Sequence, residues 1–436
     1  MPYLRPMPTP TSKSYRTPAD YIALEDRHGA HNYHPLPVVL REGRGVRVWD
    51  TEGREYFDFL SAYSAVNQGH CHPRITQALV DQSRRLSLTS RAFHNDQLGP
   101  YEAFITEYFG FGRILPMNTG AEAVETAIKL CRKWGYEVKG IPENGARIIV
   151  CGQNFHGRTT TIISFSDDPG ARGSFGPYTP GFVSVPYGDA AALRAALAED
   201  PATVAGVLVE PIQGEAGVFV PADDYLATVA AACREHNALF IADEIQTGIG
   251  RTGALLRVCG DCSCAGHCER QPDTYVRPDI LILGKALSGG AYPVSAVLAD
   301  ADIMDVIRPG QHGSTFGGNP VACAVAVTAL EVVREEGLTQ NARALGHRFR
   351  ARMQELVAAR PDLFVLVRGK GLLNALVIND TEDSDTAWRF CLALAEAGLL
   401  AKPTHGNIIR FAPPLVITAA ELDEACDRIA GVAEAF

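Results

Sequence analysis

Near-continuous apolar runs between residues 147 and 283 constrain the fold of this chain more than any other feature. The runs are Arg147–Cys151, Val204–Val209, Ala238–Ala242 and Asp279–Leu283. Strands that are apolar on both faces belong to a sheet covered on both sides, which is typical of parallel sheets. Helix-length segments such as Ala190–Ala198 and Asp224–His236 lie between the runs. This alternation predicts an α/β fold with a mostly parallel sheet.

The pattern changes after about Val321, where two long helical patterns precede shorter strands and helices. The expected elements are helices at Val321–Arg334, Asn341–Ala359 and Ser384–Gly398, and strands at Leu363–Leu366, Leu372–Ile378 and Ile408–Phe411. They predict a smaller α+β domain. Strands expected at Val46–Trp49 and Glu55–Phe59 could pair with the strands of that domain. Because 436 residues exceed the roughly 250–300 of a single core, we expect several domains. The expected division is an N-terminal segment 1–64, a large domain 65–325 with an insertion at 254–276, and a small domain 326–436.

The charge balance narrows the class of protein. The chain has 40 Lys and Arg against 50 Asp and Glu, a net charge of −10. This acidic balance does not indicate a protein that binds nucleic acid. The longest uncharged stretch, Pro309–Leu330, contains Gly317, Gly318 and Pro320, so we expect no membrane span. Residues 1–18 are basic without acidic residues, as in transit peptides, but their prolines oppose an amphipathic helix. We expect a cytoplasmic protein, with the mitochondrial matrix as the alternative.

A GxGxxG string at Gly248–Gly253 follows one of the buried runs. A dinucleotide-binding fingerprint must open a helix, so that helix N–H groups meet a pyrophosphate. Here Asp243 and Glu244 intervene and the following text is loop-like, which disfavours a dinucleotide site. The chain also lacks a GxxxxGK[ST] string, which excludes an ordinary P-loop nucleotide-binding site.

A better anion site is expected at Asn118–Ala123. Thr119 can cap the helix that follows, and Gly120 lets backbone N–H groups approach a phosphate. The alternative is simply a capped helix.

Two charged residues stand where buried strands end. Asp243 closes one run, and Lys285 follows another. Ligands of open α/β sheets bind outside the carboxyl ends of the strands, and a partly desolvated lysine is a nucleophile. The alternative is two solvated charges. A lysine, a carboxylate and an anion cradle together match the needs of pyridoxal 5'-phosphate, which takes a Schiff-base lysine and a carboxylate at its ring nitrogen.

Several long strings resemble one family. Leu239–Gly248, Leu283–Gly290 and Gly313–Pro320 resemble the class III aminotransferases, which are fold type I pyridoxal-phosphate enzymes and homodimers. Further strings are similar to the members of that family that act on ornithine: His31–Pro37, Ser61–His70, Asn154–Arg158, Val209–Glu215 and Ile408–Pro414. The resemblance implies transfer of the δ-amino group of L-ornithine to 2-oxoglutarate. The products would be glutamate 5-semialdehyde, which cyclises to pyrroline-5-carboxylate, and glutamate.

The resemblance also implies roles for individual residues. Lys285 would carry the cofactor and shuttle a proton, while Asp243 would pair with the ring nitrogen. The other expected cofactor contacts are Gln246 at the ring hydroxyl, Phe155 and Ile245 on the two ring faces, the Gly120 and Ala121 amides at the phosphate, and Thr315 from the partner subunit.

Five residues would hold the substrates. Arg158 would grip the distal carboxylate, whose planar shape suits a bidentate guanidinium. Tyr33 would hydrogen-bond the α-amine of ornithine, and Tyr63 would line the same channel. Arg410 would bind the α-carboxylate of 2-oxoglutarate, and Glu215 would mask Arg410 while ornithine reacts. Taken singly, the same residues could be packing tyrosines, a surface ion pair and a solvated acid.

Two rival functions remain open from the sequence. One is another aminotransferase of this class acting on N-acetylornithine, 4-aminobutyrate or lysine. Tyr33 and Tyr63 argue against it, because they suit a free α-amine. The other is a non-catalytic binding protein, which would lack the visible chromophore of lysine-bound pyridoxal phosphate.

The chain departs from the family pattern in the insertion, which carries four of its eleven cysteines. Cys259, Cys262, Cys264 and Cys268 could bind a structural Zn²⁺, although such sites more often use two separated pairs. Disulfides or inert thiols are the alternatives. The remaining cysteines, such as Cys131, are expected in the core of a protein kept in a reducing compartment.

Overall fold

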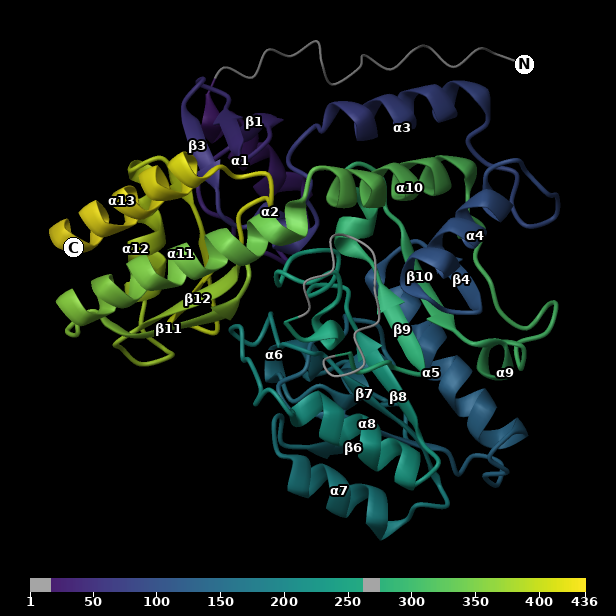
Figure 1. Cartoon of the computed structure of the whole chain (residues 1–436). Helices are drawn as coiled ribbons and strands as arrows, with labels where there is room; N and C mark the ends of the chain where they lie inside the picture. The colour runs from purple at the N-terminus through teal and green to yellow at the C-terminus, as the bar shows by residue number, and fades with distance from the viewer. Residues whose placement is uncertain (1–16, 262–274) are drawn as a thin grey trace.

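The computed structural model describes residues 17–261 and 275–436 (Figure 1). Its centre is a seven-stranded sheet in the order β4-β10-β9-β8-β7-β5-β6. The strands are β4 (Arg113–Met117), β5 (Arg147–Cys151), β6 (Phe182–Val185), β7 (Val204–Val209), β8 (Leu239–Asp243), β9 (Ile280–Leu283) and β10 (Ser295–Ala299). All four apolar runs are strands of this sheet, as predicted. The pairs from β6 to β9 are parallel, and β10 is antiparallel to both β9 and β4, so the prediction of a mostly parallel sheet is confirmed.

The buried runs have a direct explanation in the two faces of this sheet. Ile148 and Val150 of β5 lie in a core cluster with α5 (Gly120–Glu137). Ile149 and Cys151 point the other way, into the cluster that contains residues of α7 (Ala190–Glu199) and α8 (Tyr225–Glu235). Both faces are therefore apolar, which removes the alternating pattern of a half-exposed strand.

The remaining helices flank the central sheet or pack on the smaller sheets of the chain ends. They are α1 (Pro18–His28), α2 (Ser61–Ser64), α3 (Pro73–Arg85), α4 (Leu98–Phe109), α6 (Pro169–Arg172), α9 (Ala301–Met304), α10 (Pro320–Glu335), α11 (Leu338–Ala359), α12 (Thr386–Glu396) and α13 (Ala419–Ala435). Short 3₁₀ turns are η2 (Ile162–Phe165), η3 (Arg257–Cys259) and η4 (Lys285–Ser288). Helix α10 packs along α3 and α4 (Figure 1). In the described part of the chain, no helix is long and apolar enough to cross a membrane.

Two smaller sheets hold the N-terminal and C-terminal strands. One has the order β1-β2-β3-β13 and the other β11-β12-β15-β14. Their strands are β1 (Leu40–Arg44), β2 (Arg47–Asp50), β3 (Glu55–Asp58), β11 (Phe364–Lys370), β12 (Leu373–Ile378), β13 (Leu399–Leu400), β14 (Lys402–Thr404) and β15 (Ile408–Phe411). Strand β3 pairs with β13, so the N-terminal strands do join the C-terminal part of the chain. We propose that these sheets and α11 to α13 form the small domain, with the boundary near residue 325 falling inside α10.

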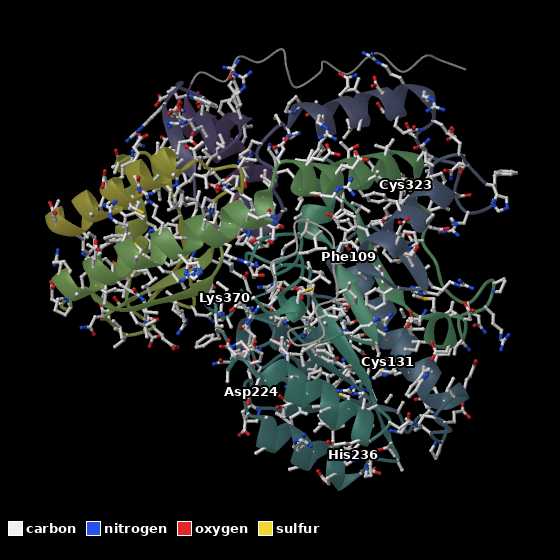
Figure 2. The ribbon with its side chains drawn as sticks, viewed as in Figure 1. Phe109, Cys131, Asp224, His236, Cys323 and Lys370 are labelled. Atoms are coloured by element: carbon white, nitrogen blue, oxygen red, sulfur yellow. The ribbon has the colours of Figure 1, made fainter. Side chains whose placement is uncertain are left out.

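Six of the seven cysteine side chains outside the insertion are buried, as expected, and Cys71 is exposed. Cys131 on α5 and Cys323 on α10 are each at most 1% exposed (Figure 2). Burial raises the pKa of both thiols to about 12, which keeps them protonated and unreactive. Of the four cysteines predicted as zinc ligands, Cys259 is buried in η3, and Cys262, Cys264 and Cys268 lie outside the described residues. The zinc site therefore stays a prediction.

Candidate active site

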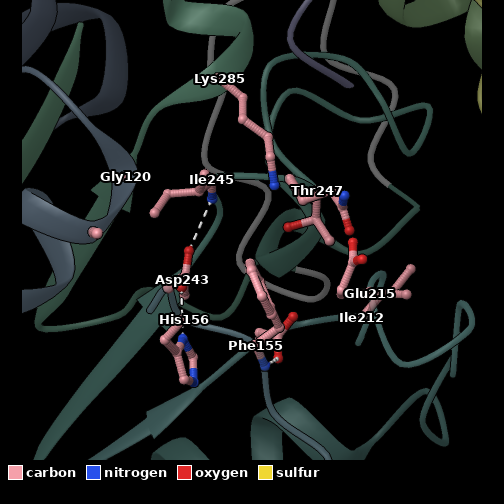
Figure 3. Close-up of a pocket in the computed structure, with 13 residues that line it drawn as sticks. Gly120, Phe155, His156, Ile212, Glu215, Asp243, Ile245, Thr247 and Lys285 are labelled. Carbon is pink, nitrogen blue, oxygen red and sulfur yellow. Dashed lines mark hydrogen bonds and ion pairs between the residues drawn. The ribbon is translucent and has the colours of Figure 1, made fainter. Parts of the chain in front are cut away.

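A pocket opens at the carboxyl ends of β7 and β8 (Figure 3). It spans about 590 Å³ of space, part of which is open to solvent. Its lining is Gly120, Ala121, Phe155, His156, Gly157, Glu210, Ile212, Glu215, Asp243, Ile245, Gln246, Thr247 and Lys285. The sequence analysis named eight of these thirteen residues as candidates.

Lys285 begins the η4 turn directly after Gly284 and extends its amine into the pocket (Figure 3). Its φ of +43° is left-handed, a conformation that costs energy for a residue with a Cβ and that concentrates at functional sites. Burial of the side chain lowers the pKa of the amine, against the opposing effect of Glu215 and Asp243. A lowered pKa leaves more of the amine neutral and nucleophilic.

Asp243 is the last residue of β8 and is 5% exposed. Its two carboxylate oxygens have different partners. Oδ1 accepts the Ile245 N–H at 3.1 Å, and Oδ2 lies 2.6 Å from His156 Nδ1 (Figure 3). Burial would lower the pKa of His156, but the hydrogen bond and charge of Asp243 raise it overall. His156 therefore helps to keep a charged carboxylate at the floor of the pocket.

Glu210 follows β7 and was treated in the sequence analysis only as part of a family string. It is 7% exposed, and its Oε1 accepts the Phe155 N–H at 2.8 Å. Burial raises the pKa of Glu210 to about 7. Its place after a buried strand, like that of Asp243, was the signal that could have identified it.

The expected anion cradle is present at the start of α5. Thr119 caps the helix by accepting the Glu122 N–H at 3.2 Å, and the Glu122 carboxylate in turn accepts the Thr119 N–H at 2.7 Å. The first N–H groups of a helix have no partner within it, so the amides of Gly120 and Ala121 are placed for an anion. A Cβ at Gly120 would come within 3.1 Å of Ile245 and narrow the cradle.

Gln246 reaches across the pocket toward another loop. It is 8% exposed, and its Nε2 donates to the Tyr63 carbonyl at 3.4 Å. A Cβ on Gly214 would come within 1.6 Å of Gln246 Oε1, so only glycine leaves room for this amide. The glutamine thus joins the end of β8 to the segment that carries Tyr63.

The substrate side of the pocket contains an ion pair between a buried arginine and a partly buried glutamate. Arg410 on β15 is 2% exposed, and its Nη1 donates to Glu215 Oε2 at 2.8 Å and to the Gly214 carbonyl at 3.0 Å. Burial would raise the pKa of Glu215, but Arg410 lowers it overall. The guanidinium also lies 5.0 Å from the centre of the Tyr63 ring. Arg410, Glu215 and Tyr63 are therefore brought together as the sequence analysis expected.

The other candidates lie further out. Arg158 lines an adjoining pocket that shares Phe155, Gly157 and Glu215 with the first, and its guanidinium carbon is 5.6 Å from the Phe155 ring centre. Tyr33 is 71% exposed, although its charge influences the pKa of Tyr63. Thr315 is exposed and does not line the pocket within one chain. The structure thus assembles most of the expected site and leaves Tyr33 and Thr315 at its outside.

Comparison with known proteins decides the family. Residues 28–432 match the family Aminotransferase class-III. The chain belongs to this family. An ornithine aminotransferase from Drosophila ananassae, described as mitochondrial, is 56% identical over 94% of this chain and 90% of its own.

Two solved structures extend the comparison. The acetylornithine aminotransferase of Elizabethkingia anophelis is 60% identical, covers 97% of this chain and 100% of its own, and has a TM-score of 0.87. The ornithine aminotransferase of Toxoplasma gondii is 48% identical, covers 97% of this chain and 96% of its own, and has a TM-score of 0.91. These matches confirm the α/β fold of type I pyridoxal-phosphate enzymes.

The family depends on pyridoxal phosphate, and the residues of this pocket fit that cofactor. The amine of Lys285 and the carboxylate of Asp243 face one cavity (Figure 3). Gly120 provides a phosphate cradle that a side chain would narrow, and Phe155 and Ile245 offer apolar surfaces in the same pocket. A lysine, a carboxylate and an anion cradle are the donor set that the cofactor requires.

Proposed function

We propose that this aminotransferase transfers the δ-amino group of L-ornithine to 2-oxoglutarate. The products are glutamate 5-semialdehyde, which cyclises to pyrroline-5-carboxylate, and glutamate. The observation that carries the proposal is the ion pair of the buried Arg410 with Glu215, which lines the same pocket as Lys285. The reacting δ-amine of ornithine has no carboxylate next to it. The reacting keto group of 2-oxoglutarate is next to the α-carboxylate, which therefore lies close to the lysine. An arginine that can be masked serves both substrates in turn.

The cofactor supplies an aldehyde that carries the amino group and a ring that stabilises negative charge on the reacting carbon. Lys285 would hold the cofactor through its amine, and the same amine would be the base and acid that moves the proton at the reacting carbon. Asp243, held by His156 and the Ile245 amide, keeps a negative charge opposite the ring nitrogen. Phe155 and Ile245 orient the ring from its two faces, and the Gly120 and Ala121 amides bind the phosphate.

The distal end of ornithine lies far from the lysine when the δ-amine reacts. Arg158 grips the carboxylate of that end through a planar, bidentate contact. Tyr33 accepts a hydrogen bond from the α-amine, and Tyr63 lines the path between the two ends. The same Arg158 then holds the distal carboxylate of 2-oxoglutarate.

Glu215 and Arg410 separate the two half-reactions. With ornithine bound, Glu215 neutralises Arg410 at 2.8 Å, so that no cation attracts the α-carboxylate of another amino acid. With 2-oxoglutarate, the glutamate turns away and Arg410 binds the α-carboxylate. Because the Arg410 side chain is almost fully buried, an unmasked Arg410 has a strong preference for an anion.

The proposal includes a homodimer whose two chains share each site. Thr315 is exposed in one chain and would reach the phosphate of the partner's site, as the family resemblance implies. Light scattering of the purified protein tests the dimer: a monomer of 46.9 kDa that is fully active would contradict it.

The first experiment is the absorption spectrum of the purified protein with its cofactor. L-Ornithine added without a keto acid should remove the visible band of lysine-bound pyridoxal phosphate, and 2-oxoglutarate should restore it. N-Acetylornithine should change the band little. A protein without this band, even after addition of pyridoxal phosphate, would contradict the enzyme function.

A second candidate substrate is N-acetylornithine, which the name of the Elizabethkingia anophelis structure favours. Acylation removes the charge of the α-amine, for which Tyr33 and Tyr63 are the proposed contacts. A spectrum that responds to N-acetylornithine and not to ornithine would keep the family and change the substrate.

For the compartment we propose the cytoplasm, with the mitochondrial matrix as the alternative. The name of the Drosophila ananassae relative places that protein in mitochondria and supports the alternative. Cell fractionation followed by immunoblotting distinguishes the two locations.

A further inference from the structure

The GxGxxG string at Gly248–Gly253 has no dinucleotide to bind, and its structure points to a different role. The segment follows β8 as a turn and loop without opening a helix. In its middle stands Arg251, whose exposed fraction is 0%. A fully buried arginine is rare and costly unless its donors are satisfied.

The Arg251 guanidinium is held by oxygens from three distant segments. Its Nε and Nη2 donate to Asn67 Oδ1 at 3.1 Å and 2.5 Å, and Nη1 donates to the Leu372 carbonyl at 2.9 Å and the Pro413 carbonyl at 2.6 Å. None of these hydrogen-bond acceptors is a carboxylate, and burial lowers the pKa of Arg251 to about 9. The planar guanidinium of Arg251 therefore holds three segments of the chain in place at once.

The segments that Arg251 joins are those that carry the substrate side of the pocket. Asn67 lies four residues after Tyr63 in the same loop, and Pro413 lies three residues after Arg410. The loop is tied down further, because Asn67 Nδ2 donates to the Ile249 carbonyl at 3.0 Å. The Leu415 N–H donates to the Asn67 carbonyl at 2.8 Å.

The surrounding backbones leave little freedom to this junction. A Cβ on Gly371 would come within 2.3 Å of the Thr252 carbonyl carbon, so the two loops touch through their main chains. The Leu372 N–H returns a hydrogen bond to the Arg251 carbonyl at 3.1 Å. In the string itself, a Cβ on Gly250 would come within 3.1 Å of Leu415 and one on Gly253 within 3.0 Å of Arg343, so these two glycines are explained by close approach of the C-terminal part of the chain.

We infer that Arg251 is a positioning residue for substrate choice, which sets Arg410 relative to the strand that ends in Asp243. The inference rests on the proposed function, in which Arg410 binds 2-oxoglutarate. Arg158 and Phe155, on the other side of the pocket, belong to a segment that Arg251 does not contact. Loss of Arg251 should therefore weaken the keto-acid half-reaction more than the ornithine half-reaction.

The test uses the holoenzyme with Arg251→Lys and Arg251→Met, and measures each half-reaction in single turnovers by the visible absorbance. The 2-oxoglutarate concentration for half-maximal rate should rise by about tenfold or more, because displacement of a binding group by about 1 Å is costly. The corresponding value for ornithine should change by less than about threefold. Arg343→Gln is the matched control, since it removes two hydrogen bonds to the Gly253 carbonyl at the same junction. It should change both half-reactions equally or not at all.

Equal losses in both half-reactions, or no change in either, would overturn the inference. If the Arg251 variants do not fold, Asn67→Ala removes two of the four guanidinium hydrogen bonds and should show the same split at smaller size. L-Glutamate as amino donor tests the role of Arg410 in an assay that does not depend on ornithine. If the unaltered enzyme does not respond to ornithine, that result contradicts the proposed function and leaves the inference about Arg251 standing. A normal response to glutamate in Arg251→Met would contradict the inference alone.

Discussion

The cofactor end and the substrate end of the pocket are built in different ways. At the cofactor end, Asp243 and Lys285 follow strands of one sheet, and Asp243 is fixed at 2.6 Å from the buried His156. At the substrate end, Arg410 comes from the small C-terminal sheet and meets Glu215 from the loop that follows β7. One end is a rigid edge, and the other is a junction between two parts of the chain.

The difference indicates that this enzyme holds its cofactor and its substrates by separate parts of the pocket. The cofactor stays in place through both half-reactions, so its contacts are best held by one framework. The two substrates differ in charge near the lysine, so their contacts need a pair of groups that can part. The following substitutions test this comparison, from the largest expected effect to the smallest.

Replacement of Lys285 by alanine should remove both half-reactions. The variant loses the amine that binds the cofactor and moves the proton, and its turnover should fall by about 10⁴-fold. Product formation from ornithine and 2-oxoglutarate measures the loss. Lys133→Ala, on the outer face of α5, is the control and should retain full activity. More than a tenth of the activity in Lys285→Ala would contradict the role.

Asp243→Asn should lower turnover by about 100-fold while both substrates still bind, because a neutral amide no longer stabilises a positive ring nitrogen. His156→Leu should act in the same direction and less strongly, since it only removes the support at 2.6 Å. Single-turnover rates with each substrate give the measurement. A lower single-turnover rate with only one of the two substrates would contradict the comparison, because the cofactor end takes part in both half-reactions.

Glu210→Gln tests the buried acid at the cofactor end through its pH dependence. The pKa of Glu210 is raised from 4.5 to about 7. Below pH 4.5 the carboxyl is protonated in both the folded and unfolded chain. Between these values only the unfolded chain ionises, so stability is lost as the pH rises, and above about 7 the loss is complete.

The Gln variant should therefore gain stability over the unaltered protein as pH rises from 4.5 to 7, by on the order of 3 kcal/mol. Thermal unfolding at pH 5 and pH 8 measures the difference. Glu199→Gln, at an exposed position on α7, should give the same small difference at both values. A constant difference for Glu210→Gln would show that the acid ionises normally in the folded protein.

Glu215→Ala tests the substrate end. It leaves Arg410 unmasked, so L-glutamate should become a better amino donor relative to ornithine, by about tenfold in kcat/KM. Glu382→Gln is the matched control, since Glu382 lines the adjoining pocket and forms no hydrogen bond or ion pair with Arg410. Unchanged discrimination in Glu215→Ala would remove the masking role of the ion pair.

The cofactor end could be predicted largely from the sequence, because its signals are local. A buried run ending in Asp243, a second followed by Lys285, and Thr119 before Gly120 each report the end of one element. Glu210 shows the limit of this reasoning. Its position after a strand is visible, but its burial and its contact with the Phe155 amide depend on how two connections fold over the sheet edge.

The sequence by itself determined the α/β alternation, four of the seven strands of the central sheet and the strand ends where a ligand can bind, since periodicity and element ends depend on near neighbours. The pairing of Arg410 with Glu215, a residue 195 positions away, was expected only from the family resemblance, and the tertiary structure alone decided that Arg251 joins Asn67 to Pro413. Residues so far apart leave no shared local pattern. Their pairing is set by the packing of the small sheets against the central one, where buried donors must find acceptors.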